Sequence, residues 1–210
     1  MKIFSIELSS KFGSIAVLEK DDVIAEKSWE ENFKNRQQLF DAMAELETDW
    51  DSVDLFAVGR GPGAFSGMRI GFTVVNALAA PLKKKIYALN SGAALAAQCG
   101  AKKTVVVGDA RRNKVWAGIF NGSEIASEFR LMERDELTAF VPEDAVVVSP
   151  DQDRLAELLV GFQGLEEPHF PTAGTLGGLV YDRFMKGIES EAYEPLYMHP
   201  PVFIEPRFPE

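Results

Sequence analysis

The segment from residue 59 to residue 71 constrains the fold most, because it places five glycines in thirteen residues between an apolar strand and an apolar helix. Residues 53–58 are almost all apolar and predict a buried strand, and Ser66 is expected to cap a helix that runs to about Ala80. Gly61-Pro62-Gly63 should then form a tight turn, since glycine tolerates close backbone approach and proline fixes its own φ.

A glycine-rich turn that leads into a helix can bind phosphate through free N–H groups and the helix dipole. A P-loop would need lysine and a hydroxyl residue after the last glycine, but Gly67 is followed by Met68 and Arg69. A dinucleotide-binding fingerprint has a different glycine spacing, and Pro62 would interrupt it. Two interpretations of the turn remain: it is an anion-binding loop of another kind, or it is a purely structural turn.

Composition and charge narrow the function classes. The chain has 210 residues, 46% of them hydrophobic, and a formal net charge of −10, which disfavours nucleic-acid binding by this chain alone. It has no apolar run of about 18 residues, and its first residues enter a strand without a signal-peptide pattern, so we expect a cytoplasmic protein with no membrane contact. The single cysteine, Cys99, cannot form an internal disulfide and is expected to be an inert thiol.

Hydrophobic periodicity predicts the same order of elements twice. In the first half, strands are predicted at residues 2–8, 13–20 and 22–29, and again at 53–58 and 86–89. Helices are predicted at residues 35–47, at 66–80 and from residue 91. In the second half, strands are predicted at residues 104–108, 115–120, 124–131 and 145–149. Helices are predicted at residues 133–140, before the last of these strands, and 151–161, after it. This pattern indicates an internal duplication, with subdomains at residues 1–100 and 101–210.

The string Gly-Pro-Gly-Ala-Phe-Ser-Gly-Met-Arg-Ile-Gly at residues 61–71 resembles the signature of the YeaZ/TsaB family, which reads Gly-Pro-Gly-Ser-Phe-Thr-Gly-Leu-Arg-Ile-Gly. Residues 89–97, 107–116 and 194–198 resemble three further family blocks in the same order. The resemblance marks a structural motif made of Gly61, Pro62, Gly63, Phe65, Ser66, Gly67, Arg69 and Gly71.

The resemblance implies a two-lobed α/β fold of the actin-like ATPase type, and the duplicated three-strand meander with crossover helices agrees with it. In that superfold the loop after the first strand faces the nucleotide phosphates, commonly with an aspartate where this chain has Glu7. The candidate nucleotide-loop residues are Glu7, Ser9, Ser10, Gly61, Gly63, Asp109 and Arg111. In the alternative interpretation, Glu7 is a solvated strand end, and Asp109 forms a local ion-pair cluster with Arg111 and Arg112.

Candidate catalytic groups are scarce. The two histidines, His169 and His199, lie in proline-flanked loops and do not form the His-x-x-x-His metal motif of active relatives. Ser66 and Ser91 are expected to cap helices and have no histidine base nearby in the sequence. We therefore expect no catalytic residues, no metal site and no cofactor of the chain's own.

The helix at residues 66–80 is apolar nearly all round, which requires cover on two sides. The helix at residues 35–47 adds apolar side chains beside it. We expect the two helices to dock with the equivalent pair of a second subunit, through Leu39, Phe40, Met43, Met68, Ile70, Phe72, Val74, Val75 and Leu78. The alternative is cover within the chain, by residues 172–185.

The resemblance implies a non-catalytic scaffold subunit required for N6-threonylcarbamoylation of adenosine 37 in tRNA. Its implied partners are a catalytic TsaD-like paralogue and a TsaE-like ATPase, with a homodimer when the chain is alone and tRNA bound only through the complex. ATP or ADP with Mg²⁺ could occupy an interface of that complex. The alternative is a stand-alone ATPase or phosphotransferase of the actin superfold.

Overall fold

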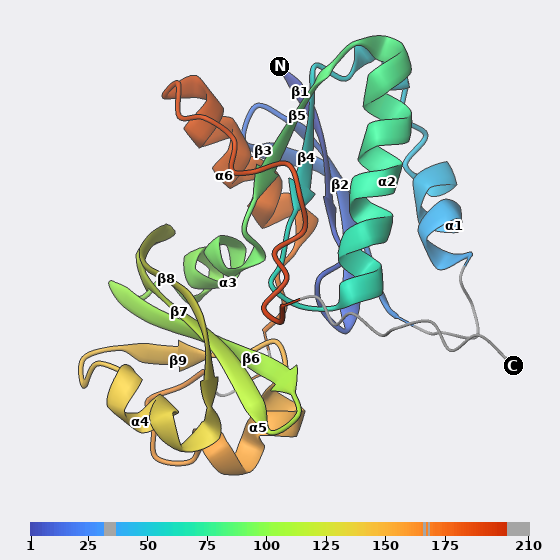
Figure 1. The fold of residues 1–210 in the computed structure, drawn as a ribbon. Coiled ribbons are helices and arrows are strands. Elements are labelled where there is room, and N and C mark those ends of the chain that lie inside the picture. Colours follow the sequence, from blue (N-terminus) through green and yellow to red (C-terminus); the bar gives the residue numbers. More distant parts are fainter. Residues whose placement is uncertain (32–36, 166, 168, 201–210) are drawn as a thin grey trace, which may run out of the picture.

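A computed structural model describes residues 1–31, 37–165, 167 and 169–200 of the chain. It consists of two lobes, each built around one β-sheet, and Figure 1 shows the larger lobe above the smaller one. The two sheets have the orders β3-β2-β1-β4-β5 and β8-β7-β6-β9. The shared order of the first four strands is the predicted duplication, and the arrangement is the two-lobed actin-like fold.

The first sheet begins with an antiparallel meander and continues with parallel strands. Its strands are β1 (Lys2–Glu7), β2 (Phe12–Glu19), β3 (Asp22–Glu30), β4 (Leu55–Gly59) and β5 (Lys85–Leu89). β1 pairs antiparallel with β2 and parallel with β4, in a register that places Ile3 opposite Leu18 and Leu55. Parallel neighbours need crossover connections. These are supplied by α1 (Gln38–Glu45) with the 3₁₀ turn η1 (Trp50–Ser52), and by α2 (Phe65–Leu82).

The second sheet repeats this plan with shorter connections. Its strands are β6 (Lys103–Arg111), β7 (Lys114–Asn121), β8 (Glu124–Glu133) and β9 (Val146–Val148). The crossover from β8 to β9 contains the 3₁₀ turn η2 (Arg134–Glu136) and the short helix α4 (Leu137–Phe140), and α5 (Gln152–Leu159) follows β9. A single parallel bridge between Val147 and Gly164 stands where the first lobe has β5.

The first sheet is covered on both faces. On one face, α1 and α2 pack over a core that includes Phe4, Phe56 and Val75. On the opposite face lies α6 (Ala173–Met185), which contacts β1 and β2 most. The helix α3 (Ser91–Cys99) packs beside α6 and against β6, β7 and β9 of the second sheet. Figure 1 shows α6 and α2 on opposite sides of the sheet. The predicted alternative, in which residues 172–185 cover α2, is therefore wrong, because the sheet separates the two helices.

The predicted limit between residues 100 and 101 falls between α3 and β6, where one sheet ends and the other begins. The helix α6, which we assigned to the second subdomain, returns to the first sheet. The assignment of the chain to subdomains 1–100 and 101–210 stays a prediction.

Two predicted helix caps are wrong. The N-cap of α2 is Ala64, so the helix begins one residue before Ser66 and has no side-chain cap. The cap of α3 is Asn90, whose side chain accepts a hydrogen bond of 2.9 Å from the N–H of Ala93. Residues 35 and 36, at the start of the predicted first helix, lie outside the described part, and α1 begins at Gln38.

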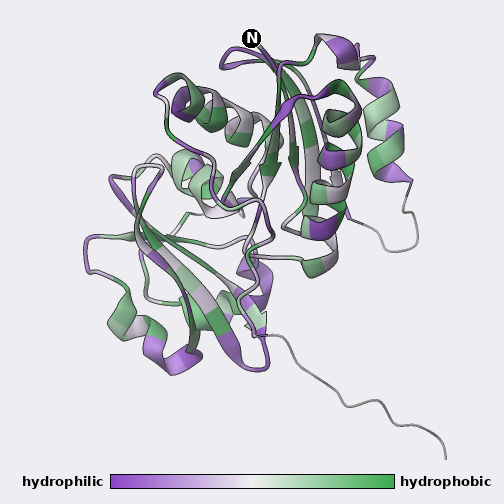
Figure 2. Cartoon of the chain, turned by 45° about the horizontal axis from the view of Figure 1, so that its top comes forward, coloured by the Kyte–Doolittle hydropathy of each residue, from purple (hydrophilic) through white to green (hydrophobic). Residues whose placement is uncertain are grey.

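Figure 2 shows hydrophobic residues along the strands of the first sheet and along α2. None of the helices described here combines the length and the apolar character that a membrane crossing requires.

Candidate functional site

The glycine-rich turn packs directly against the β1–β2 turn of the same chain. A Cβ atom on Gly63 would lie 2.0 Å from the carbonyl oxygen of Ser9, and one on Gly67 would lie 1.9 Å from that of Leu8. The N–H of Ala64 donates a hydrogen bond of 2.7 Å to the Ser9 carbonyl. These glycines therefore let two backbone segments of one chain touch, which a side chain would prevent.

Gly61 anchors the other end of this turn. It has a φ of 87°, a conformation that favours glycine. Its N–H donates to the Ser91 hydroxyl at 3.0 Å, and its carbonyl accepts from the Ser91 N–H at 2.8 Å. The turn is thus tied to the first residue of α3 as well as to the β1–β2 turn. This contact geometry supports the structural interpretation of the motif.

Glu7 is fully buried, so the interpretation of this residue as a solvated strand end is wrong. One carboxylate oxygen accepts from the Ser9 N–H at 2.7 Å, and the other accepts from the Ser91 hydroxyl at 2.6 Å. A Cβ on Gly59 would lie 1.8 Å from Oε2 of Glu7, so only glycine leaves room for this carboxylate. Burial raises the pKa of the Glu7 carboxyl, and the hydrogen bonds from Ser9 and Ser91 lower it in part.

Ser10 closes the β1–β2 turn locally. Its hydroxyl donates to the carbonyl of Phe12 at 2.8 Å and accepts from the N–H of Phe12 at 3.1 Å. The predicted nucleotide-loop residues of the first lobe, Glu7, Ser9, Ser10, Gly61 and Gly63, thus lie close together, and they bind mainly one another and Ser91.

Asp109 and Arg111 belong to a separate cluster in the second lobe. The Asp109 side chain is nearly buried, accepts from the Arg111 N–H at 3.0 Å and pairs with the guanidinium groups of Arg111 and Arg134 at 3.4 and 3.8 Å. Its own N–H donates to Asp151 at 3.0 Å. In the described part of the chain, neither a hydrogen bond nor an ion pair joins Asp109 or Arg111 to the glycine turn. This geometry supports the local ion-pair interpretation.

The two histidines bind backbone carbonyl groups. His169 Nδ1 lies 2.7 Å from the carbonyl of Glu167, and His199 Nε2 lies 2.6 Å from that of Ala110. Within the described residues, no three His, Cys, Asp or Glu side chains are grouped so that they could hold a metal ion.

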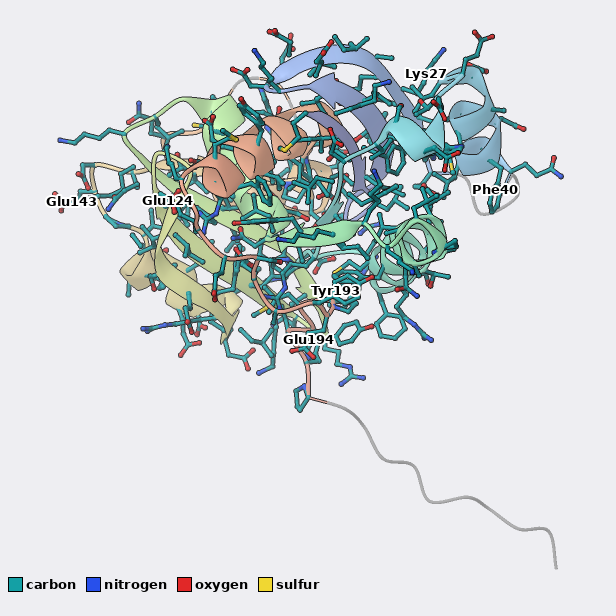
Figure 3. All side chains as sticks on the ribbon, turned by 90° about the horizontal axis from the view of Figure 1, so that it is seen from above. Lys27, Phe40, Glu124, Glu143, Tyr193 and Glu194 are labelled. Carbon is teal, nitrogen blue, oxygen red and sulfur yellow. The ribbon has the colours of Figure 1, made fainter. Side chains whose placement is uncertain are left out.

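The predicted interface residues divide into two sets. Leu39, Met68, Phe72 and Val75 are buried in this chain, because they face the sheet, and they cannot form an outward contact. The outer face, as we call the remaining set, consists of the exposed Phe40 and Ile70 with the half-buried Met43, Val74 and Leu78. Figure 3 shows Phe40 on the outer side of α1. Phe40 is 62% exposed and Ile70 is 47% exposed, which is high for large apolar side chains.

A C-terminal strap, residues 188–198, borders the outer face on the side away from α1. The Tyr193 ring lies 5.0 Å from that of Phe72, and the Tyr197 ring lies 5.0 Å from that of Phe65. Figure 3 shows Tyr193 beside α2. The strap therefore supplies intramolecular cover for α2 of the kind that the alternative assigned to residues 172–185.

An anchoring group at the ends of β4 and β5 holds the strap. Arg60 donates to the Glu194 carbonyl at 3.0 Å and to the Glu191 carboxylate at 3.3 Å. The Asn90 side chain donates to the same carboxylate at 2.7 Å. Arg60, Glu191 and the two strap tyrosines were not predicted from the sequence, and the family block at residues 194–198 was the one signal that pointed to this segment.

Comparisons with known proteins agree with the fold and with the motifs. A family model described as "TsaD: tRNA N6-adenosine threonylcarbamoyltransferase" matches residues 25–132, just over half of the chain. The "tRNA threonylcarbamoyladenosine biosynthesis protein TsaB" of Bacillus subtilis is 28% identical over 198 residues, which cover 85% of this chain and 86% of that protein.

Two solved structures have a fold similar to that of this chain. The structure of YeaZ from Pseudomonas aeruginosa has a TM-score of 0.77 and 24% identity, and the match covers 93% of this chain and 99% of that one. A second structure, described as similar to peptidase YeaZ from the same organism, has a TM-score of 0.76 and 22% identity, with 94% and 99% coverage. With the signature at residues 61–71 and the family model taken together, the chain belongs to the YeaZ/TsaB family.

Proposed function

We propose that this chain is a non-catalytic subunit of the machinery that places N6-threonylcarbamoyl on adenosine 37 of tRNA. The observation that carries the proposal is the family match together with the relative named as a TsaB biosynthesis protein. In this proposal the chemistry belongs to a TsaD-like paralogue, and a TsaE-like ATPase joins the assembly. The chain would act in the cytoplasm and contact tRNA only through the complex.

The interior of the first lobe supports a structural rather than a catalytic role. Glycines that could border a phosphate site instead contact the backbone of Leu8 and Ser9, and Glu7 binds Ser9 and Ser91. A nucleophile would need an adjacent base. The hydroxyl of Ser91 donates to a carboxylate that is already buried among protein atoms, and His169 and His199 bind backbone carbonyl groups. Under this proposal, ATP or ADP with Mg²⁺ binds only where a partner completes a site.

The outer face supports docking as the means of action. Phe40 on α1 and Ile70 and Val74 on α2 are exposed or half-buried apolar side chains on two helices that cover the same face of the sheet, and helices associate by packing ridges into grooves. The same surface would take the TsaD-like paralogue in the complex and a second copy when the chain is alone, since a paralogue of the same fold presents equivalent helices.

Co-purification tests the proposal. The tagged chain is mixed with the TsaD-like protein of the same organism, as wild type and as Val74→Glu, with Ile24→Glu as the control. Ile24 is 63% exposed and lies on the edge strand β3 rather than on α1 or α2. Wild type and Ile24→Glu should retain the partner, and Val74→Glu should lose it. Failure of the wild type to bind the TsaD-like protein would overturn the proposed mechanism.

A further inference from the structure

Four arginines gather at one end of the second sheet, and we call them the arginine cluster. Arg111 ends β6 and Arg112 lies in the turn before β7. Arg134 begins η2, and Arg154 lies on α5. Figure 1 shows the end of β6 beside α5, and these two elements are in contact.

Two enclosed carboxylates hold three of these arginines. The Asp109 side chain, 7% exposed, pairs with Arg111 at 3.4 Å and with Arg134 at 3.8 Å. The Asp151 carboxylate pairs with Arg154 at 3.4 Å and accepts the N–H of Asp109 at 3.0 Å. The side chains of Arg111 and Arg154 are much more open, at 65% and 53% exposed. The aspartates therefore orient the arginines from the inner side and leave guanidinium donors facing solvent.

The turn that carries two of these arginines has an unfavourable backbone conformation. Arg111, Arg112 and Asn113 have φ values of 64°, 51° and 62°. Asparagine tolerates this left-handed region, but arginine enters it rarely, and glycine would occupy it at lower cost. Arg112 is exposed and forms no hydrogen bond or ion pair with any residue that the structure describes. An unpaired cation at a strained turn indicates contact with another molecule.

The surroundings of the cluster determine when it can bind an anion. Glu133 and Asp153 each pair with a lysine, and Asp135 and Glu136 add two exposed carboxylates. The chain as a whole has a net charge of −10, which repels a polyanion at long range. The cluster therefore suits a polyanion that another subunit already holds in place.

We propose that the arginine cluster contacts phosphate groups of the tRNA backbone when this chain is in its complex with the TsaD-like protein. This inference rests on the proposed function, which places a tRNA in that complex. A guanidinium group binds a phosphate through two parallel N–H···O bonds, and such contacts position a nucleic acid without reading its sequence. The cluster lies in the second lobe and the outer face lies in the first, so the proposed docking does not use these arginines.

Binding of fluorescently labelled tRNA to the complex tests this inference. The cluster variant, Arg112→Glu with Arg154→Glu, leaves both ion pairs of Asp109 intact. The control, Arg130→Glu with Lys186→Glu, makes the same change in charge at exposed positions on β8 and after α6. In fluorescence anisotropy at about 0.1 M salt, we expect the cluster variant to bind tRNA about tenfold more weakly and the control to bind within about twofold of wild type.

The salt dependence separates lost phosphate contacts from other causes of weak binding. Each lost contact should lower the slope of log Kd against log salt concentration by about 0.7 to 0.9, so the cluster variant should lose about 1.5. Arg112→Gln with Arg154→Gln adds no negative charge beside Asp151 and should lower the slope by a similar amount. Retention of the TsaD-like protein and an unchanged Tm show that each variant is folded.

The inference is overturned if the cluster variant binds tRNA like the control, or if its affinity falls with no change in the salt slope. Unchanged tRNA binding with loss of a protein subunit would assign the cluster to an acidic protein surface and would also overturn it. If the wild-type chain does not bind the TsaD-like protein, the proposed function fails and this inference fails with it. If the complex forms and the cluster variant binds tRNA normally, only this inference fails.

Discussion

The hydroxyl of Ser91 donates a 2.6 Å hydrogen bond to Oε2 of Glu7, although 84 residues separate them in the chain. This contact ties the end of β1 to the start of α3, and Ser91 also binds both backbone polar groups of Gly61. The carboxylate, the hydroxyl and the glycine turn therefore form one buried connection between three loops. Its position corresponds to the place where we expected a nucleotide loop.

Glu7→Gln should change how stability depends on pH. Burial raises the folded-state pKa of this carboxyl above its ordinary value of 4.5, so the folded chain binds more protons than the unfolded chain just above that pH. The contribution of Glu7 to stability is fully present below pH 4.5 and is lost as the pH rises through the raised pKa. Urea unfolding at several pH values should show that the free energy of unfolding of the wild type falls, relative to that of the variant, as the pH rises above 4.5. A difference that is the same at every pH would contradict this account.

Gly67→Ala should destabilise the fold by about 3 kcal/mol, because its new methyl group would overlap the carbonyl of Leu8, a backbone atom that cannot move easily. The control is Gly178→Ala in α6, where the nearest atom to the added Cβ is 3.9 Å away. That change should be neutral or should stabilise the helix by up to about 1 kcal/mol. Chemical unfolding of both variants checks this, and equal effects would refute the close-packing explanation.

Arg60→Ala should loosen the strap. The side chains of Arg60 and Glu191 are only 12% and 23% exposed, so loss of the arginine leaves a largely enclosed carboxylate with Asn90 as its remaining side-chain donor. We expect a loss of about 2 kcal/mol and faster amide exchange over residues 188–198. Arg130→Ala, at an exposed position on β8, is the control and should change neither. Unaltered exchange in the strap would show that Arg60 does not anchor it.

The chain alone should show no saturable binding of Mg²⁺ with ATP in titration calorimetry. The physical reason is that the backbones of the two loops touch each other and leave no gap for a phosphate between Gly63 and Ser9. Saturable binding or ATP turnover by the isolated chain would favour the alternative, a stand-alone ATPase or phosphotransferase.

Much of the fold could be predicted from the sequence, because strand and helix periodicities are local. The meander, the crossover helices and the repeat after residue 103 all appear in the structure at nearly the predicted positions. The inward stripe of α2, with Met68, Phe72 and Val75, also follows from helical spacing alone.

What could not be predicted depends on contacts between distant segments. Ser91 has the residue type of a helix cap, but Asn90 takes that role, and the Ser91 hydroxyl is used by Glu7. Glu7 looks like a solvated strand end until Gly59, Ser9 and Ser91 are placed against it. The return of α6 to the first sheet and the packing of Tyr193 on Phe72 likewise have no local signal.

The central claim, that this chain acts by docking rather than by chemistry, is tested most directly by reconstituted tRNA modification. The reaction contains the TsaD-like and TsaE-like proteins, threonylcarbamoyl-adenylate and tRNA, with wild-type chain, Val74→Glu, Ile24→Glu or no chain. We predict modified adenosine 37 with wild type and with Ile24→Glu, and a loss with Val74→Glu that matches its loss of partner binding. Full modification without the chain, or modification by the chain in the absence of the TsaD-like protein, would contradict the claim.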